Sequence, residues 1–331
     1  MQRILVIQTA FIGDVVLATG LLEKLHQHYP DAALDILVRK GNESLFDGHP
    51  FLHEVLIWNK KSAKYRHLFQ LLKKIRQNRY DIVINVQRYF ATGFLTAFSG
   101  ASRKIGFDKN PFRFFFTDII PHHFSGRADA HHEIQRNHAL ILSFTDEHPA
   151  KPVLYPTAKA FEKVKMYQTG PYICIAPASV WFTKQYPADQ WVDLIRQLPE
   201  SYTIYLLGAP GDKNLCDQIR IQSGNKATDL SGQLSFLESA ALMKNAVMNY
   251  VNDSAPMHFA SAMNAPVTAV YCSTIPGFGY GPLSDNSHII ETIESLSCRP
   301  CGLHGHQTCP EKHFKCAHSI QTEQLLNSLS S

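Results

Sequence analysis

Short apolar runs alternate with helix-patterned segments along almost the whole chain, and this alternation restricts the fold more than any other feature. In the first half, five apolar runs are predicted strands, at residues 3–8, 34–38, 55–58, 81–86 and 103–106. Between them, residues 14–29 and 68–75 carry apolar side chains at helical spacing. Strands that alternate with helices form βαβ units, and continuous apolar runs are typical of parallel strands buried on both faces. The sequence therefore predicts an α/β fold built on a parallel sheet.

The alternation stops near residue 150 and then starts again. Residues 148–156 contain three prolines and no hydrophobic period, which is typical of a linker. Beyond this linker, four more apolar runs are predicted strands, at residues 172–176, 203–207, 248–251 and 267–271. Because a domain averages ~150 residues, the 331-residue chain is expected to form two domains of similar size, residues 1–150 and 157–331. Ligands of open α/β sheets bind at the carboxyl ends of the strands, so a cleft between the two domains is the expected site.

The composition narrows the function classes. Charged residues make up 18% of the chain and hydrophobic residues 45%, which excludes global disorder. The formal net charge of +4 suits an anionic substrate or a membrane surface but is small for a dedicated nucleic-acid binder. No apolar run reaches the roughly 18 residues of a membrane-spanning helix, and the N-terminus lacks a signal-peptide cleavage site. We therefore expect a cytoplasmic protein, in which the seven cysteines are thiols or metal ligands rather than disulfides.

The segment TAFIGD, residues 9–14, follows the first predicted strand. Gly13 permits close approach of the backbone to a ligand, and Asp14 begins the first helix. Asp14 is either a general base that faces the cleft or a first-turn carboxylate that complements the helix dipole. One glycine does not make the G-x-G-x-x-G fingerprint, which disfavours a dinucleotide-dependent oxidoreductase.

Two loops of the second half follow predicted strands and have the composition of phosphate or nucleoside sites. In residues 176–187, the hydroxyl of Ser179 and the cation of Lys184 suit a diphosphate, although an ordinary loop with a solvated lysine has the same composition. Residues 208–212, which end in Asp212, line a nucleoside pocket or simply reverse the chain.

The segment NDSAPMH, residues 252–258, has the signature of a helix start. Ser254 is a candidate N-cap, and Pro256 is expected in the first turn. The N-terminus of such a helix also binds phosphate, so capping and anion binding are compatible.

The segment 109–124, KNPFRFFFTDIIPHHF, mixes aromatic and basic residues. It either contacts a membrane surface or an amphiphilic acceptor, or its phenylalanines fill the core of the first domain. Arg88, Arg103 and Arg127 lie in or near this part of the chain and are candidate ligands of acceptor phosphates, since arginine pairs well with phosphate. Ordinary surface charge is the equally good alternative.

The C-terminal segment CRPCGLHGHQTCPEKHFKC carries four cysteines within 19 residues: Cys298, Cys301, Cys309 and Cys316. A C-x-x-C pair with two further ligands is typical of structural zinc. The second pair is separated by six residues, which matches a zinc ribbon only loosely. Zinc ligation, disulfides and reduced thiols all remain open.

Taken in this order, the segments resemble the ADP-heptose:lipopolysaccharide heptosyltransferases, also called glycosyltransferase family 9. The resemblance covers nearly the whole chain and is most specific at RILVIQTAFIGDVVLATGLL, APASVWFTKQYP and VNDSAPMHFASAMNAPVTAVY. The cysteine-rich tail resembles a segment found in a subset of the family. The resemblance implies a GT-B architecture, in which two Rossmann-like domains face each other across a cleft. The N-terminal domain would hold the acceptor and the C-terminal domain the nucleotide-sugar.

The resemblance also implies the reaction and the roles of the candidate residues. It implies an inverting transfer of heptose from ADP-heptose to a lipopolysaccharide core acceptor, with no cofactor. Asp14 falls on the position of the catalytic base and Lys184 on the donor-phosphate loop, where it would stabilise the departing diphosphate. The remaining implied donor-binding residues are Gly13, Ser179, Asp212, Asp253, Ser254 and His258.

Two departures from the family pattern leave the donor open. The family usually has glycine at the position of Ala255, and it often has proline early in the first helix, where this chain has Thr19 and Gly20. The alternatives are a transferase of the same fold with another nucleotide-sugar, a nucleotide-sugar epimerase, and a non-catalytic metal-containing binding protein. A lipopolysaccharide acceptor is anchored in the inner leaflet, so the resemblance implies a cytoplasmic enzyme that is peripheral to the inner membrane.

Overall fold

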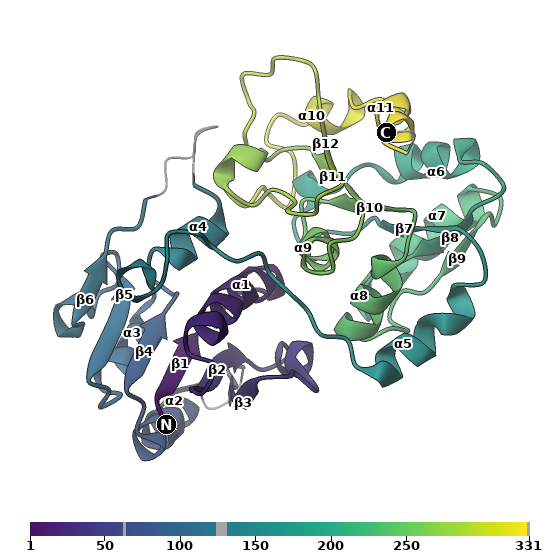
Figure 1. Ribbon diagram of the computed structural model, residues 1–331. Coiled ribbons are helices and arrows are strands. Elements are labelled where there is room, and N and C mark those ends of the chain that lie inside the picture. Colours follow the sequence, from purple (N-terminus) through teal and green to yellow (C-terminus); the bar gives the residue numbers. More distant parts are fainter. Residues whose placement is uncertain (62–63, 124–130, 330–331) are drawn as a thin grey trace. The chain divides into compact units, whose positions relative to one another are not determined.

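The computed structural model describes residues 1–61, 64–123 and 131–329, and its contacts divide the chain into two compact units (Figure 1). The first unit runs to Tyr155 and the second begins at Pro156. Each unit contains one six-stranded sheet whose paired strands are all parallel. The predicted α/β fold with parallel sheets is confirmed.

The sheet of the first unit has the strand order β3-β2-β1-β4-β5-β6. Its strands are β1 (Arg3–Ile7), β2 (Ala33–Arg39), β3 (Leu52–Trp58), β4 (Ile82–Asn85), β5 (Arg103–Phe107) and β6 (Asp118–Ile120). Its helices are α1 (Ile12–His28), α2 (Lys64–Asn78), α3 (Phe90–Ala97) and α4 (Glu133–His138), with short 3₁₀ turns η1 (Glu43–Phe46), η2 (Arg113–Phe115) and η3 (Leu142–Phe144). The α1 helix packs on α4, and α2 packs on α3.

The core of this unit explains why the central strands are apolar throughout. Leu5 and Ile7 of β1 share a buried cluster with Leu68 and Ile75 of α2. Ile4 and Val6 point to the other face of the sheet and are fully buried as well. Both faces are therefore covered, as is usual for a parallel sheet.

The sheet of the second unit has the strand order β12-β11-β10-β7-β8-β9. Its strands are β7 (Tyr172–Ala176), β8 (Thr203–Leu206), β9 (Ala227–Asp229), β10 (Met248–Asn252), β11 (Val267–Tyr271) and β12 (Ser287–Glu291). Its helices are α5 (Ala158–Val164), α6 (Ala188–Gln197), α7 (Lys213–Gln222), α8 (Phe236–Lys244), α9 (Ala255–Ala262), α10 (Lys315–His318) and α11 (Thr322–Asn327). Its 3₁₀ turns are η4 (Lys165–Tyr167), η5 (Phe182–Lys184), η6 (Pro210–Asp212) and η7 (Pro276–Phe278). The α6 helix packs on α7 and α11, while α8 packs on α5 and α9 (Figure 1).

The stretch interpreted as a linker is held against α1 for most of its length. The backbone N–H of Val153 donates to Oγ1 of Thr19 over 2.9 Å. A Cβ atom at Gly20 would lie only 2.5 Å from the carbonyl oxygen of Ala150. This close backbone contact accounts for Thr19-Gly20 in α1, at a place where a larger residue would push the stretch away.

The part of the chain that the structure describes contains no helix long and apolar enough to cross a lipid bilayer.

Candidate functional site

Each sheet has a point between two central strands where the strand order reverses, and ligands of α/β sheets bind there, at the carboxyl ends. In the first unit this switch point lies between β1 and β4, and in the second between β7 and β10. Asp14 follows β1, Lys184 follows β7 and Asp253 follows β10. These three candidate residues thus lie in the segments that leave the switch points of their own units.

In the first unit, Gly13 and Asp14 are the second and third residues of α1. Asp14 is half-buried and lies in the first turn, where its charge complements the helix dipole. Its negative charge also raises the pKa of Arg39, the last residue of β2, against a larger lowering by burial. Two groups of opposite charge, Asp14 and Arg39, therefore interact at the carboxyl edge of this sheet.

Lys60 joins this edge, and the sequence analysis missed it. Its Nζ donates to the carbonyl oxygen of Thr9 over 2.7 Å and to Thr9 Oγ1 over 3.0 Å. The ammonium lies 4.7 Å from the centre of the Trp58 ring. Burial, together with the positive charges of Arg39 and Lys64, lowers the pKa of Lys60 to about 8. The available signal was a lysine two residues beyond a strand, which is too common to single out a site.

A pair of glutamines bridges the switch point of the first unit. Gln87 Nε2 donates to Gln8 Oε1 over 2.5 Å, which joins the chain after β4 to the chain after β1. Arg88 follows directly and is exposed. Burial lowers the pKa of His122 to about 4, and the positive charge of Arg88 contributes to this lowering.

One predicted acceptor residue, Arg103, does not join this edge. Arg103 is the first residue of β5 and therefore lies at the amino end of the sheet. It forms an ion pair with Asp118 at 2.7 Å and donates to Ser143 Oγ over 2.7 Å. Its guanidinium also lies 4.3 Å from the centre of the Phe144 ring, so Arg103 is engaged in packing within the unit. Arg127 lies outside the described residues.

In the second unit, Lys184 and Asp253 form an ion pair across the switch point. Lys184 Nζ lies 2.6 Å from Asp253 Oδ2, and the two side chains are only 15% and 8% exposed. Thr274 Oγ1 donates to the same carboxylate oxygen over 2.7 Å. The side chain of Asn252 accepts from the N–H of Tyr186 and donates to the carbonyl of Pro177, which fastens both ends of the loop that carries Lys184.

The start of α9 differs from the expected cap. Ser254 occupies the N-cap position, but its hydroxyl donates to the carbonyl of Asn252 over 3.3 Å and makes no capping bond. The prediction that the Ser254 side chain caps the helix is therefore wrong, whereas Pro256 does lie in the first turn. His258 is the fourth residue of α9 and is buried. The first turn of α9 thus keeps N–H groups that its N-cap side chain does not bind.

The other two donor candidates lie on neighbouring loops. Ser179 is half-buried, and its carbonyl accepts from Gln185 Nε2 over 2.6 Å. Asp212 ends η6, and its Oδ2 accepts from the N–H of Ala209 over 2.7 Å, so this carboxylate closes its own turn.

The cysteine-rich tail lies against the loop that carries Lys184, a contact that the sequence analysis missed. The N–H of Thr183 donates to the carbonyl of His306 over 3.0 Å, and the N–H of His306 donates to Thr183 Oγ1 over 2.7 Å. Between the tail and β11, the N–H of Cys301 donates to the carbonyl of Ser273 over 2.8 Å. Gly305 has a φ of 72°, and a Cβ there would lie 2.8 Å from Thr183 Oγ1. Glycine is therefore required at this contact.

The structure supports one of the three alternatives left open for the tail cysteines. Cys298, Cys301, Cys309 and Cys316 are free thiols. Over the residues that the structure describes, no group of three or more His, Cys, Asp or Glu side chains is arranged to hold a metal ion, so a zinc site at the tail is not supported. Cys316 is buried in the apolar core with Cys309 packed against it, and burial raises the pKa of Cys316 to about 12. Cys309 and Cys316 therefore serve as small apolar groups in the packing of the tail.

Comparison with known proteins identifies the family. The profile described as glycosyltransferase family 9 (heptosyltransferase) matches residues 68–314. Lipooligosaccharide heptosyltransferase 2 of Haemophilus ducreyi is 25% identical over 317 residues, which cover 88% of this chain and 89% of that protein.

Solved structures agree in fold over the full length. A glycosyl transferase of family 9 from Veillonella parvula superposes with a TM-score of 0.85 at 22% identity, covering 99% of this chain and 96% of that one. The E. coli ADP-heptose LPS heptosyltransferase II gives a TM-score of 0.80 at 21% identity, with 100% and 98% covered. The two parallel α/β units are those of the GT-B fold. Since the family profile spans well over half of its length, the chain belongs to glycosyltransferase family 9, the heptosyltransferases, and is a glycosyltransferase.

Proposed function

We propose that this protein is an inverting heptosyltransferase that moves heptose from ADP-heptose to the core of a lipopolysaccharide acceptor. The observation that carries the proposal is the buried Lys184–Asp253 pair at the switch point of the second unit, beside the start of α9. An ammonium next to helix N–H groups is suited to a diphosphate. The E. coli relative is named for ADP-heptose, which supports ADP as the nucleotide.

In the proposed donor site, each candidate residue has a separate task. Lys184 pairs with the diphosphate, and Ser179 and the N–H groups after Ser254 donate hydrogen bonds to it. Asp253 holds the ammonium of Lys184 in place through the 2.6 Å contact. His258 borders the donor from α9, Asp212 lies on the adenosine side, and Gly13 lets the α1 backbone come close to the donor.

In the proposed reaction, the acceptor hydroxyl oxygen attacks the anomeric carbon of the donor. Asp14 accepts the hydroxyl proton while the new glycosidic bond forms. The bond between the anomeric carbon and the diphosphate oxygen breaks, and ADP leaves with the electron pair. Lys184 stabilises the negative charge that develops on this oxygen. A single displacement inverts the configuration at the anomeric carbon.

The proposed acceptor site lies at the carboxyl edge of the first unit. Arg39, Lys60 and Arg88 supply positive charge there for the phosphates and acidic sugars of a lipopolysaccharide core. Arg103 is left out of this site because it is engaged with Asp118 at the other edge. An acceptor anchored in the inner leaflet places the proposed enzyme in the cytoplasm, peripheral to the inner membrane.

Thermal unfolding in the presence of nucleotides tests the donor. ADP, UDP, GDP and CMP are added in parallel without divalent metal, and a ligand that binds only the folded state raises the midpoint. We expect a rise with ADP alone that is lost in Lys184→Gln. A rise with UDP or GDP would keep the reaction and replace the donor. No rise with any nucleotide would overturn the proposed donor site.

A further inference from the structure

A continuous set of aromatic rings is exposed on the first unit. The Phe69 ring of α2 contacts Phe94 of α3 at 5.8 Å between centroids, and Phe94 contacts Phe98 at 5.1 Å. Phe98 in turn contacts Phe115 of η2 at 5.7 Å. The flanking Phe90 and Phe114 are 64% and 79% exposed. Among the described phenylalanines of residues 109–123, Phe116 is buried and Phe112 is half-buried, whereas Phe114 and Phe115 are exposed. The alternative in which these phenylalanines fill the core therefore does not hold for Phe114 and Phe115. A connected, solvent-exposed apolar patch of this kind marks an interaction site.

The rings on α2 lie in a stretch of sequence that is rich in positive charge. Residues 55–80 contain eight Lys or Arg residues and no Asp or Glu. Along α2, Tyr65, Phe69, Lys73 and Arg76 are all exposed, and their spacing places them on one face of the helix. Lys74, on the adjacent face, pairs with Glu54 at 3.2 Å. Among the described residues, no carboxylate lies within ion-pair distance of Lys73 or Arg76.

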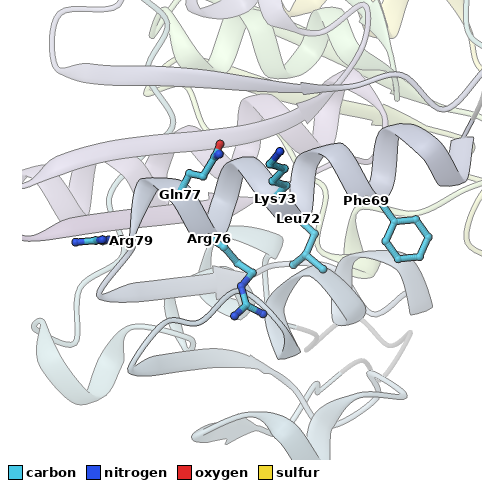
Figure 2. A pocket seen from close by; sticks show the side chains of 6 residues that line it. All are labelled: Phe69, Leu72, Lys73, Arg76, Gln77 and Arg79. Carbon is cyan, nitrogen blue, oxygen red and sulfur yellow. The ribbon is translucent and has the colours of Figure 1, made fainter.

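A shallow hollow of about 590 Å³ lies on the same helix (Figure 2). Its apolar lining comes from Phe69 and Leu72, and its polar lining from Lys73, Arg76, Gln77 and Arg79. In Figure 2, Leu72 and Arg76 extend from the same side of α2, so an apolar and a cationic group lie next to each other. Such an arrangement suits a molecule that carries both an anionic group and hydrocarbon.

We propose that the face formed by Tyr65, Phe69, Lys73, Arg76, Phe90 and Phe114, here called the α2–α3 face, docks on a bilayer of anionic phospholipid. The exposed rings enter the boundary between headgroups and acyl chains, and the cations contact lipid phosphates. A second copy of this chain is a poorer occupant, because it would bring two acid-free basic faces together. A water-soluble anion would leave the aromatic rings exposed.

The biological reason for this docking rests on the proposed function, because the membrane would be the one that holds the acceptor. The docking itself does not depend on that function. Lys60, at the carboxyl edge near Asp14, precedes the first residue of α2 by four positions. Docking through α2 therefore brings the proposed acceptor edge close to the lipid surface.

Co-sedimentation of the full chain with vesicles tests the docking. Vesicles are made of phosphatidylcholine alone or of an equimolar mixture with phosphatidylglycerol. We expect the protein to bind the mixed vesicles, to bind pure phosphatidylcholine poorly, and to dissociate at high salt. We expect the triple variant Phe69→Ser, Phe90→Ser, Phe114→Ser, and separately Lys73→Gln with Arg76→Gln, to lower the partition constant about tenfold or more.

Matched controls come from the second unit. Met166 and Ile293 are 70% and 85% exposed, and Lys159 is exposed on α5. Met166→Ser with Ile293→Ser, and Lys159→Gln, should leave vesicle binding unchanged. If the triple variant fails to show a thermal unfolding transition, the variant Lys73→Gln with Arg76→Gln still tests the docking.

Three results would overturn the inference: equal binding to both kinds of vesicle, unchanged binding by both α2–α3 variants, or self-association of the wild type through this face without vesicle binding. Failure of the proposed function is a separate result. A protein that transfers heptose to a water-soluble, delipidated acceptor but does not bind vesicles would disprove only the docking. A protein that binds vesicles through this face but shows no response to ADP would disprove only the donor assignment.

Discussion

At the residue scale, Lys60 is the group whose ionisation the fold changes within the range of an enzyme assay. Burial and the charges of Arg39 and Lys64 lower its pKa from 10.5 to about 8. Raising the pH from 7 to 9 therefore removes a positive charge from the proposed acceptor edge. In the unfolded chain this lysine keeps its proton up to a pH near 10.5, so its contribution to stability rises with pH between the two values.

We predict that the KM for an anionic acceptor rises as the pH passes through about 8, because Lys60 is discharged. Lys60→Arg keeps its charge at every pH of the assay and should flatten this rise. Lys60→Met should have a high KM throughout. The measurement is KM against pH for the three proteins, and an identical profile for wild type and Lys60→Arg would exclude Lys60 as the titrating group.

A second residue-scale prediction concerns the Lys184–Asp253 pair. Lys184→Gln leaves a buried carboxylate without its cation, and it should cost about 3 kcal/mol of stability as well as abolish the response to ADP. The double variant Lys184→Gln, Asp253→Asn removes the unpaired charge, so we expect its free energy of unfolding to recover while the response to ADP stays absent. Denaturant unfolding with and without ADP measures both quantities. Recovery of ADP binding in the double variant would contradict the role of Lys184.

At the element scale, the tail and the segment before Tyr155 pack through glycine contacts that admit no side chain. Gly305 and Gly302 both have positive φ, 72° and 74°, but only Gly305 has neighbours within 4 Å of an added Cβ. The two positions therefore have a similar backbone cost of substitution, and they differ in that a Cβ at Gly305 would also press on Thr183, Lys184 and Ser273.

We predict that Gly305→Ala weakens ADP binding more than Gly302→Ala does, because it pushes on the loop that carries Lys184. Both variants should lose a similar amount of stability from the backbone alone. ADP titration by calorimetry compares them. Equal ADP affinities would mean that the tail does not position the donor loop.

The second contact at this scale holds the end of the first unit. Gly20→Ala would place a Cβ 2.5 Å from the carbonyl oxygen of Ala150, and we expect a loss of about 1–3 kcal/mol. Gly170 has no neighbour within 4 Å of an added Cβ and an ordinary φ, so Gly170→Ala is the control and should be close to neutral. The measurement is the denaturant midpoint of unfolding for the two variants. Equal midpoints would show that the stretch around Ala150 moves away from α1 without a loss of stability.

At the scale of the whole molecule, the sequence was sufficient for the fold class because the buried parallel strands are apolar at most positions. The edge strands β6, β9 and β12 were not predicted, since they are short or half-exposed and include polar residues such as Asp118 and Asp229. Candidate residues directly after strands, Asp14 and Asp253 among them, were found from the pattern of strand ends.

The missed residues depend on contacts between distant parts of the chain. Lys60 is defined by its bonds to Thr9, and His306 by its pairing with Thr183, more than a hundred positions earlier. The same limit explains Arg103, whose sequence neighbourhood is basic but whose partner, Asp118, comes from the adjacent strand. The cysteines had the composition of a zinc site, but their geometry is set by packing of the tail on the core.

The central claim is that this glycosyltransferase moves heptose from ADP-heptose with Asp14 as the base. The most direct test is the turnover of ADP-heptose with a heptose-deficient lipopolysaccharide core acceptor, for wild type and Asp14→Asn, with ADP binding measured in parallel. We predict transfer by the wild type, and a loss of about 10²–10⁴ in kcat for Asp14→Asn with ADP binding unchanged. Transfer at the wild-type rate by Asp14→Asn, or no transfer by the wild type, would contradict the account.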